Sequence, residues 1–223
     1  IYLDNNATTR IDDEVLNTML PFLREEYGNA SSLQHKMGRT AHQAIEKSRQ
    51  SIAKSIGANP KEIFFTSGAT EAINTVLRGV FTRYQRIGKH IISAKTEHKA
   101  VLTTLEILEK NGAEITYLPI DYNGNINLDD LEEAIRTDTI LICLMHANNE
   151  TGVVHPIEDI AKIATKKNVL FFSDTTQAIG KIHTDYEKSG VDICCFSGHK
   201  LHGPKGIGTL YIRRKSRPIQ IEP

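Results

Sequence analysis

Short apolar segments alternate with longer amphipathic segments along most of the chain. The apolar segments are rich in β-branched and aromatic residues and are bounded by turn residues, which is typical of buried strands. The predicted strands cover residues 62–66, 89–93, 113–118, 139–145, 169–173, 191–196 and 208–212. The predicted helices cover residues 12–27, 35–56, 69–84, 99–110, 128–135 and 157–166. The first helix is expected to break at Pro21, and the second to end at Gly57.

This alternation predicts an α/β fold. Helices that connect successive strands favour a mostly parallel sheet with helices on both faces. With 223 residues and 39% hydrophobic content, the chain can bury a core as one large domain or a domain and a half. Ligands of such sheets bind at the carboxyl ends of the strands, so the residues after each predicted strand are the first candidates for a site.

Composition and charge narrow the class of protein further. The 27 basic residues balance the 27 acidic ones, so the charge does not favour nucleic acid as a partner. No apolar segment approaches the roughly 20 residues of a membrane span, and the first residues do not resemble a signal peptide. We therefore expect a cytosolic protein that does not contact a membrane.

Three cysteines lie inside apolar segments. Cys143 falls in one predicted strand, and the adjacent pair Cys194 and Cys195 falls in another. Adjacent cysteines bridge poorly and the sequence contains no CxxC motif, so it supports neither a disulfide framework nor a zinc site. All three are expected to be reduced core residues.

Two polar clusters each follow a strand and begin a helix. In the first, Thr66 to Glu71, small residues and the Thr70 hydroxyl could hold a phosphate at the free amides of the helix N-terminus. A plain helix cap at Ser67 or Thr70 explains this segment nearly as well. The second, Thr96 to Lys99, contains His98, whose imidazole could stack on a flat ring or shuttle a proton, or could equally be a surface histidine.

Two further clusters follow later strands. The segment from His146 to Gly152 offers neutral amides that suit hydrogen bonds to a phenol or a carboxylate, although an ordinary turn is the simpler interpretation. The segment from Ser173 to Gln177 places Asp174 after a buried strand, where a carboxylate is expensive to bury unless a cation pairs with it. A protonated pyridine nitrogen would be such a cation, and a helix cap is the alternative.

A lysine follows the predicted strand 191–196. Lys200 stands in the turn that begins at Ser197, at an edge of the sheet. An amine that is partly desolvated there, beside other cationic groups, loses its proton more easily and can form a Schiff base with a carbonyl compound. Taken alone, a solvated loop lysine is the more common case. Combined with a phosphate cradle, a stacking histidine, two amides and a carboxylate, Lys200 completes the residue set of a pyridoxal phosphate site.

Five motifs carry a resemblance to a known family. They are Tyr2 to Thr9, Thr66 to Glu71, Thr96 to Lys99, Asn148 to Gly152 and Ser197 to Gly208. In order and spacing they resemble the cysteine desulfurases of the NifS and IscS type, and the likeness covers essentially the whole chain. The resemblance implies the large domain of the fold type I pyridoxal phosphate enzymes over residues 16–223, preceded by a segment, 1–15, that packs toward a smaller domain.

The resemblance also implies a role for each site residue. Lys200 would bind the cofactor covalently and act in catalysis, while Asp174 would pair with the pyridine nitrogen and keep it protonated. His98 would stack on the ring and act in catalysis as well. Gln177 would hydrogen-bond the phenolic oxygen, and Asn149 would lie near that oxygen and the substrate carboxylate. The phosphate would be bound by Ala69, Thr70, Ser197 and His199.

The implied activity is sulfur transfer from L-cysteine. A homodimeric enzyme would convert L-cysteine to L-alanine and hand the sulfur, as a persulfide, to an iron–sulfur scaffold or another acceptor protein. Family members continue well past the position of Pro223 into a domain that supplies the cysteine nucleophile and a substrate-binding arginine, so these 223 residues are expected to lack both. None of the three cysteines follows a glycine- and serine-rich loop, and none is assigned that role. Two alternatives stay open: a non-catalytic half-protein or cofactor-binding assembly partner, and a selenocysteine lyase or another fold type I lyase or transaminase.

Overall fold

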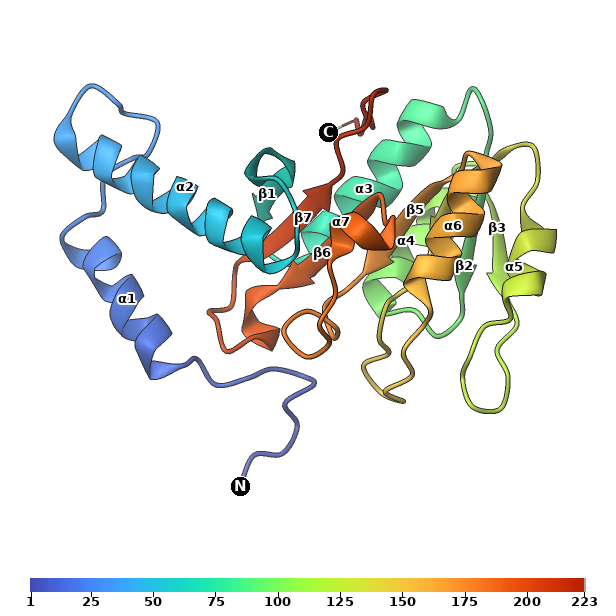
Figure 1. Ribbon diagram of the computed structural model, residues 1–223, viewed down its shortest axis with the longest axis horizontal. Coiled ribbons are helices and arrows are strands. Elements are labelled where there is room, and N and C mark those ends of the chain that lie inside the picture. The colour runs from blue at the N-terminus through green and yellow to red at the C-terminus, as the bar shows by residue number, and fades with distance from the viewer. Residues whose placement is uncertain (223) are drawn as a thin grey trace.

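The centre of the fold is one seven-stranded sheet in the computed structural model, which describes residues 1–222 (Figure 1). The strands are β1 (Ile63–Thr66), β2 (His90–Ala94), β3 (Glu114–Leu118), β4 (Thr139–Cys143), β5 (Leu170–Asp174), β6 (Ile193–Ser197) and β7 (Gly208–Ile212). The helices are α1 (Asp13–Arg24), α2 (Lys36–Ser55), η1 (Pro60–Glu62), α3 (Ala69–Tyr84), α4 (Lys99–Lys110), α5 (Leu128–Ala134), α6 (Ile157–Lys167), α7 (Tyr186–Ser189) and η2 (Gly198–Lys200). None of the helices in residues 1–222 combines the length and the apolar character needed to cross a membrane.

The strand order is β1-β7-β6-β5-β4-β2-β3. Strands β2 to β6 all run parallel to one another, whereas β7 is antiparallel to both β6 and β1. A parallel strand needs a crossover of about a dozen residues or more, and the segment 198–207 between β6 and β7 is too short for one. The predicted α/β fold with a mostly parallel sheet is therefore confirmed, and β7 is antiparallel because of its short connection.

Helices cover both faces of the sheet (Figure 1). One apolar core lies under α5, α6, α7 and the end of α2, and the other lies under α3 and α4. Consecutive residues of a strand enter opposite cores, as Phe171 and Phe172 do in β5 and Cys194 and Cys195 in β6. Each of these side chains is fully buried, and complete burial of an apolar side chain contributes about 1.5–3 kcal/mol relative to exposure. Strands β2, β4 and β6 are buried at every position because neither face of the central sheet meets water.

Helix α1 differs from its prediction at Pro21. It runs unbroken from Asp13 to Arg24. A proline removes the hydrogen bond to the carbonyl four residues earlier, here that of Asn17. Asn17 is exposed and no residue of α1 is buried, so water can bind that carbonyl. The predicted break at Pro21 is therefore wrong, and the lost hydrogen bond falls on a side of the helix that is open to solvent.

The other predicted elements are present, with ends that differ by at most two residues, but α7 and the 3-10 helices η1 and η2 were not predicted. The four residues of α7 are too few to show a helical period. The Asp185 carboxylate accepts a hydrogen bond from the Lys188 N–H at 2.9 Å, and Gly190 ends the helix with φ of 85°. This short helix buries Tyr186 in the first core.

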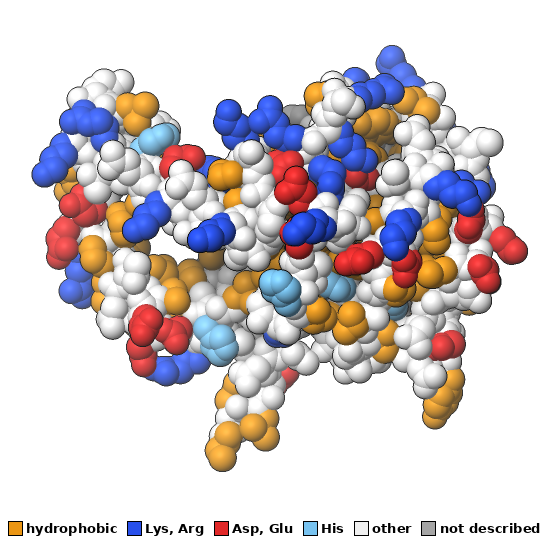
Figure 2. Space-filling view, in the orientation of Figure 1, with side chains coloured by type: hydrophobic (Ala, Val, Ile, Leu, Met, Phe, Trp, Pro, Cys, Tyr) orange, Lys and Arg blue, Asp and Glu red, His pale blue; other side chains and the backbone are white. Residues whose placement is uncertain are grey.

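Apolar side chains stay exposed at the N-terminal end of the chain and along α1 (Figure 2). Ile1, Tyr2 and Leu3 are exposed, and so are Phe22 and Leu23 on α1. Contiguous exposed apolar surface is typical of a region that contacts another polypeptide segment.

Candidate active site

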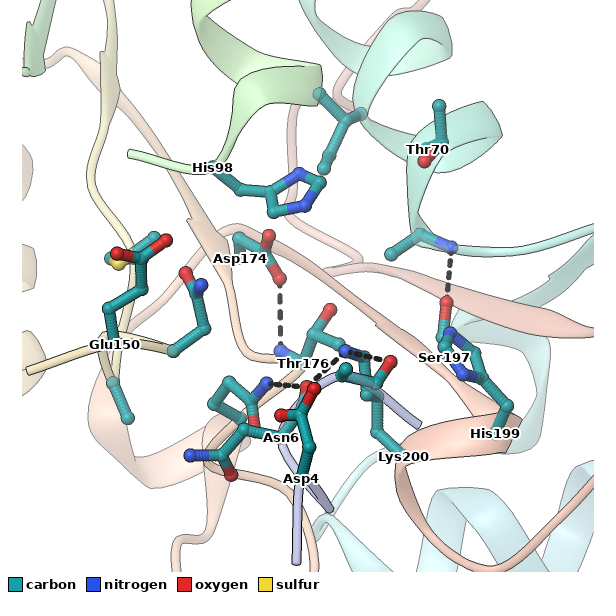
Figure 3. A pocket seen from close by; sticks show the side chains of 17 residues that line it. Asp4, Asn6, Thr70, His98, Glu150, Asp174, Thr176, Ser197, His199 and Lys200 are labelled. Carbon is teal, nitrogen blue, oxygen red and sulfur yellow. Dashed lines mark hydrogen bonds between the residues drawn. The ribbon is translucent and has the colours of Figure 1, made fainter. Parts of the chain in front are cut away.

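A cavity of about 720 Å³ opens at the carboxyl edge of the parallel strands (Figure 3). All nine predicted site residues line it: Ala69, Thr70, His98, Asn149, Asp174, Gln177, Ser197, His199 and Lys200. They come from the beginning of α3, the residue before α4, the turn after β4, and the ends of β5 and β6. The topology of a parallel sheet places these segments at one edge, as the sequence predicted. The cavity also has lining residues for which no role was predicted, among them Asp4, Asn6, Ala7 and Glu150.

Asp174 is a buried carboxylate at the end of β5. Its side chain is 6% exposed, and Oδ1 accepts a hydrogen bond from the Thr176 N–H at 2.9 Å. Burial raises the pKa of Asp174, and hydrogen bonding from Thr176 and the charges of His98 and Lys200 oppose this shift. No ion pair in residues 1–222 involves this carboxylate. It faces the cavity without a paired cation, which favours a ligand with a cationic atom.

The first turn of α3 and the Ser197 hydroxyl meet on one side of the cavity (Figure 3). Gly68, the N-cap of α3, has no side chain with which to cap the helix. The Ala69 N–H donates to Ser197 Oγ at 2.8 Å, which leaves the hydroxyl proton of Ser197 free to be donated. The Thr70 side chain is exposed beside it. The alternative of a plain cap at Ser67 or Thr70 is therefore wrong, and these donors at a helix N-terminus suit a phosphate.

His98 is the N-cap of α4, and this role fixes its ring. Its Nδ1 accepts a hydrogen bond from the Ala100 N–H at 3.1 Å. In the neutral form of the ring, Nδ1 is therefore the unprotonated nitrogen and the proton is on Nε2. The imidazole is exposed and projects over the Asp174 carboxylate (Figure 3). This placement suits stacking on a flat ligand that is held at Asp174.

Lys200 ends the 3-10 helix η2 and points its amine toward the N-terminal segment (Figure 3). Its Nζ donates to the carbonyl of Asn6 and, at 2.8 Å, to the next carbonyl along the chain. Burial and then the nearby Lys181 ammonium lower the pKa of Lys200, whereas the carboxylates of Asp174 and Asp4 raise it. An amine with a lowered pKa gives up its proton more readily and is a better nucleophile toward a carbonyl group.

The two predicted amides differ in their contacts. Gln177 is held from both ends, because its Nε2 donates to the Asn6 carbonyl at 2.9 Å and its Oε1 accepts from Lys181 at 2.5 Å. Asn149 is half-buried, and its side chain forms no hydrogen bond within residues 1–222. The turn that carries it is shaped by Asn148, whose Oδ1 accepts two backbone N–H groups at 2.9 Å each. The Asn149 amide is therefore free to bind a ligand.

The N-terminal segment docks onto the loop that carries Lys200. Thr9 Oγ1 donates to the His199 carbonyl at 2.9 Å and accepts from the His202 N–H at 2.8 Å. Thr8 Oγ1 lies 3.0 Å from His199 Nδ1, and burial, followed by the charges of neighbouring lysines, lowers the pKa of His199. Contacts between residues so far apart in sequence cannot be read from periodicity. The packing of segment 1–15 toward a smaller domain stays a prediction.

Glu97 is a buried acid that no sequence pattern identified. It lies between β2 and α4, is 5% exposed, and its Oε1 accepts a hydrogen bond from the Met145 N–H at 2.6 Å. Its Oε2 has no hydrogen-bond partner in residues 1–222. Burial raises the pKa of Glu97 well above its ordinary value, and the charge of Asp174 raises it further, although the hydrogen bond from Met145 opposes both. These effects favour the neutral acid form of Glu97 near the Asp174 carboxylate.

We expect Glu97→Gln to stabilise the fold increasingly as the pH rises above 4.5, the ordinary value for this acid. The folded state keeps a proton there that the unfolded chain releases, so wild-type stability falls across the window between 4.5 and the raised pKa, by at most about 1.4 kcal/mol per pH unit. Glutamine cannot ionise and keeps the acceptor for Met145. Urea unfolding between pH 4 and 8 measures the difference, with the exposed Glu133→Gln as a control. If the difference in free energy of unfolding between Glu97→Gln and wild type does not change with pH, Glu97 is not the buried acid with the raised pKa.

All three cysteines are buried core residues with free thiols, as predicted. Burial raises the pKa of Cys194 to about 12 and raises the pKa of Cys143 and Cys195 as well. The thiolate is the reactive form of cysteine, so none of these three is suited to act as a nucleophile. In the part of the chain described, no group of His, Cys, Asp or Glu residues is placed to hold a metal ion.

The groups around the cavity match one class of ligand. Donors at α3 and Ser197 suit a phosphate, the buried Asp174 suits a cationic ring nitrogen, Gln177 offers an amide donor, and Lys200 offers an amine. Pyridoxal phosphate carries the four complementary groups: a phosphate, a pyridine nitrogen, a phenolic oxygen and an aldehyde. The observation that decides the fit is Asp174, because burial of a carboxylate without a paired cation is unfavourable until a cation binds.

Comparison with known proteins points to one family. The family described as Aminotransferase class-V matches residues 1–221. A protein of Pectobacterium carotovorum subsp. carotovorum (strain PC1), named Cysteine desulfurase IscS, is 50% identical over 224 residues, which cover 100% of this chain and 55% of that protein. The chain spans about half the length of the curated relatives it matches.

Solved structures give the same result for the fold. A structure described as a NifS-like protein is 48% identical with a TM-score of 0.94, and the match covers 98% of this chain and 60% of that one. A second, described as SspA in complex with cysteine, is 40% identical with a TM-score of 0.91 and covers 95% of this chain and 61% of that one.

Proposed function

The chain belongs to the aminotransferase class-V family, and on this premise we propose that it forms the cofactor-binding large domain of a cysteine desulfurase. The proposed reaction converts L-cysteine to L-alanine and transfers the sulfur to a cysteine thiolate of the complete enzyme, as a persulfide. One observation carries the proposal. The buried, unpaired Asp174 carboxylate shares a cavity with the Lys200 amine and with the donors at the beginning of α3.

The cofactor of this family is pyridoxal 5'-phosphate. In the proposed site Asp174 pairs with the pyridine nitrogen, Gln177 donates to the phenolic oxygen, and His98 stacks on the ring. Lys200 provides the amine that attaches the cofactor. The phosphate is held at the N-terminus of α3 and the loop after β6 by Ala69, Thr70, Ser197 and His199.

The bound cofactor supplies an electron sink that makes the Cα–H of the amino acid acidic. Lys200 then takes up and returns that proton at Nζ, a role for which its lowered pKa is suited. Asp174 keeps the ring nitrogen protonated because a buried carboxylate favours a cation at its side. His98, with its proton on Nε2, offers a donor above the ring, and the free Asn149 amide binds the substrate carboxylate.

The assembly of the complete protein is also a proposal. We propose a cytosolic homodimer of chains in which residues 16–223 form the large domain and segment 1–15 packs toward a smaller domain. The exposed apolar side chains of that segment and of α1 support a contact with further polypeptide. The sulfur acceptor is proposed to be an iron–sulfur scaffold or another acceptor protein.

The 223-residue chain, loaded with pyridoxal phosphate, should exchange the Cα proton of L-cysteine with solvent deuterium but should not release sulfide. Exchange needs only the cavity residues, whereas sulfur transfer needs a thiolate, and the three thiols of this chain are buried with raised pKa values. Proton NMR in deuterium oxide measures the exchange, and a colorimetric sulfide assay measures the release. Intact mass must first show that the sample contains no longer chain.

Two outcomes would contradict this account. Bound cofactor without any Cα exchange would favour the alternative, a non-catalytic half-protein. Sulfide release that disappears when Cys143, Cys194 and Cys195 are all replaced by alanine would show that one of these buried thiols is the nucleophile. Comparing Cα-proton exchange with L-cysteine and with L-selenocysteine tests which of the two substrates the site prefers.

A further inference from the structure

Lys181 lies beside the site without a role in the proposed function. Its Nζ donates to Gln177 Oε1 at 2.5 Å and lies 3.5 Å from Asn6 Oδ1. The Asn6 carbonyl in turn accepts hydrogen bonds from Gln177 Nε2 and from Lys200 Nζ. One chain of contacts therefore joins Lys181 to the amide and the amine that the proposed function uses.

The backbone after β5 sets the approach of Lys181 to Gln177. The Ala178 carbonyl accepts the Lys181 N–H at 3.0 Å, which closes a tight turn. Gly180 has φ of 73°, a left-handed conformation that favours glycine, so the turn needs glycine for its conformation. The contact between Lys181 and Gln177 is therefore built into the fold.

An ammonium group also decides which way the Gln177 amide points. Lysine has three donors and no acceptor, so it can only bind the oxygen of the amide. With Oε1 turned toward Lys181, the Nε2 donor must face the opposite side, where it reaches the Asn6 carbonyl at 2.9 Å at the edge of the cavity. A ligand oxygen in the cavity thus meets a donor from Gln177 and not a second acceptor.

Lys181 is also the positive charge that acts most strongly on Lys200. Three charged groups face the Lys200 amine: Lys181 on the turn after β5, Asp174 at the end of β5, and Asp4 on the N-terminal segment. Lys181 lowers the pKa of Lys200 and the two carboxylates raise it, in addition to the larger effect of burial. His199, the residue before Lys200, is a further titratable neighbour of the amine. Removal of the Lys181 charge takes away the largest charge effect that lowers the pKa of Lys200, which favours the protonated form of the amine.

We propose that Lys181 is a positioning residue of this site, whose ammonium fixes the donor side of the Gln177 amide toward the ligand and keeps a positive charge beside Lys200. The second part, the positive charge beside Lys200, concerns the chain without any ligand. The first part rests on the proposed function, because it requires a ligand with an anionic oxygen opposite Gln177.

The charge effect can be measured without cofactor. Lysines labelled by reductive methylation with carbon-13 formaldehyde titrate individually by NMR, and the Lys200 signal is assigned by its absence in Lys200→Arg. We expect Lys181→Met to shift the Lys200 titration to higher pH, and Lys181→Arg, which keeps the charge, to leave it near the wild-type position. Lys162→Met removes an exposed charge on α6 and serves as the matched control.

The effect on the amide is measured with a pair of ligands. Pyridoxal 5'-phosphate and its analogue without the phenolic oxygen differ only in the group that Gln177 is proposed to bind. We expect Lys181→Met to weaken binding of pyridoxal 5'-phosphate about tenfold more than it weakens binding of the analogue, and this extra loss is the worth of one hydrogen bond. Any loss caused by the change at Lys200 is common to both ligands, because both carry the aldehyde. A merely structural role of Lys181 would weaken both ligands equally.

Each of the two measurements can contradict its part of the proposal independently of the other. An unchanged Lys200 titration in Lys181→Met, or an equal shift in Lys162→Met, would overturn the charge effect whether or not the chain binds any cofactor. Equal losses for the two ligands would overturn the orienting effect. A wild-type chain that binds neither ligand would instead overturn the proposed function, and the Lys200 titration would still decide the role of the Lys181 charge.

Discussion

The Lys200→Ala variant is expected to lose covalent attachment of pyridoxal phosphate completely and to slow Cα-proton exchange by about 10²–10⁴-fold. Both effects follow from the amine, which lies at the cavity with a pKa lowered by burial and by Lys181. Cofactor should still bind without a covalent bond, because the donors at Ser197 and the beginning of α3 remain. Absorbance at the visible bands of the cofactor measures the covalent attachment. Deuterium exchange followed by NMR measures the rate of Cα-proton exchange.

Lys205→Ala is the matched control, because it removes a lysine from the same loop but outside the residues that line the cavity. It should keep the absorbance and the exchange rate of wild type. Wild-type exchange in Lys200→Ala, or equal losses in both variants, would contradict the assignment of the amine to Lys200.

Asp174→Ala is expected to slow Cα-proton exchange by about a hundredfold or more while weakening cofactor binding much less. The carboxylate holds a proton on the ring nitrogen, and alanine cannot do so, whereas the phosphate contacts that anchor the cofactor are untouched. Asp174→Asn keeps the size and the hydrogen bond from Thr176 but not the charge, so it should resemble the alanine variant in rate. Exchange rates and cofactor affinities of the three proteins give the comparison.

The pH dependence provides a second check on Asp174. Burial raises the pKa of Asp174 in the chain without cofactor, and pairing with a cationic ring nitrogen would oppose this shift, so the loaded chain should keep the carboxylate ionised to a lower pH than the free chain. We expect exchange by the wild-type chain to decline on the acid side through this protonation, and the same decline to be absent from the residual rate of Asp174→Asn. A wild-type rate in Asp174→Ala, or affinity that falls as steeply as rate, would contradict the role.

Much of the sheet could be predicted because buried parallel strands are continuously apolar and end in polar turns. Asp174 and Lys200 each follow such a strand, and the edge of a parallel sheet brings strand ends together, so their meeting follows from the fold class. The antiparallel β7 depends on the length of one connection, and the unbroken α1 depends on the solvent around Pro21. Neither property is carried by hydrophobic periodicity.

The contacts that complete the site could not be predicted in this way. Asn6 reaches Lys200 across 194 positions of sequence, and only the folded chain shows that its carbonyl also binds Gln177. Glu97 lies next to the predicted His98, yet its burial depends on the packing of β4 against the loop that carries it. In the sequence these residues look like ordinary polar positions. Their burial and their hydrogen bonds arise only in the folded structure.

The most direct test of the central claim is to identify the lysine that holds the cofactor. The chain is loaded with pyridoxal 5'-phosphate, reduced with borohydride and digested, and the peptides are analysed by mass spectrometry. We predict that the cofactor mass is found on Lys200 alone. Labelling of Lys181, Lys205 or Lys99 in its place, or no stable label on any lysine, would contradict the account.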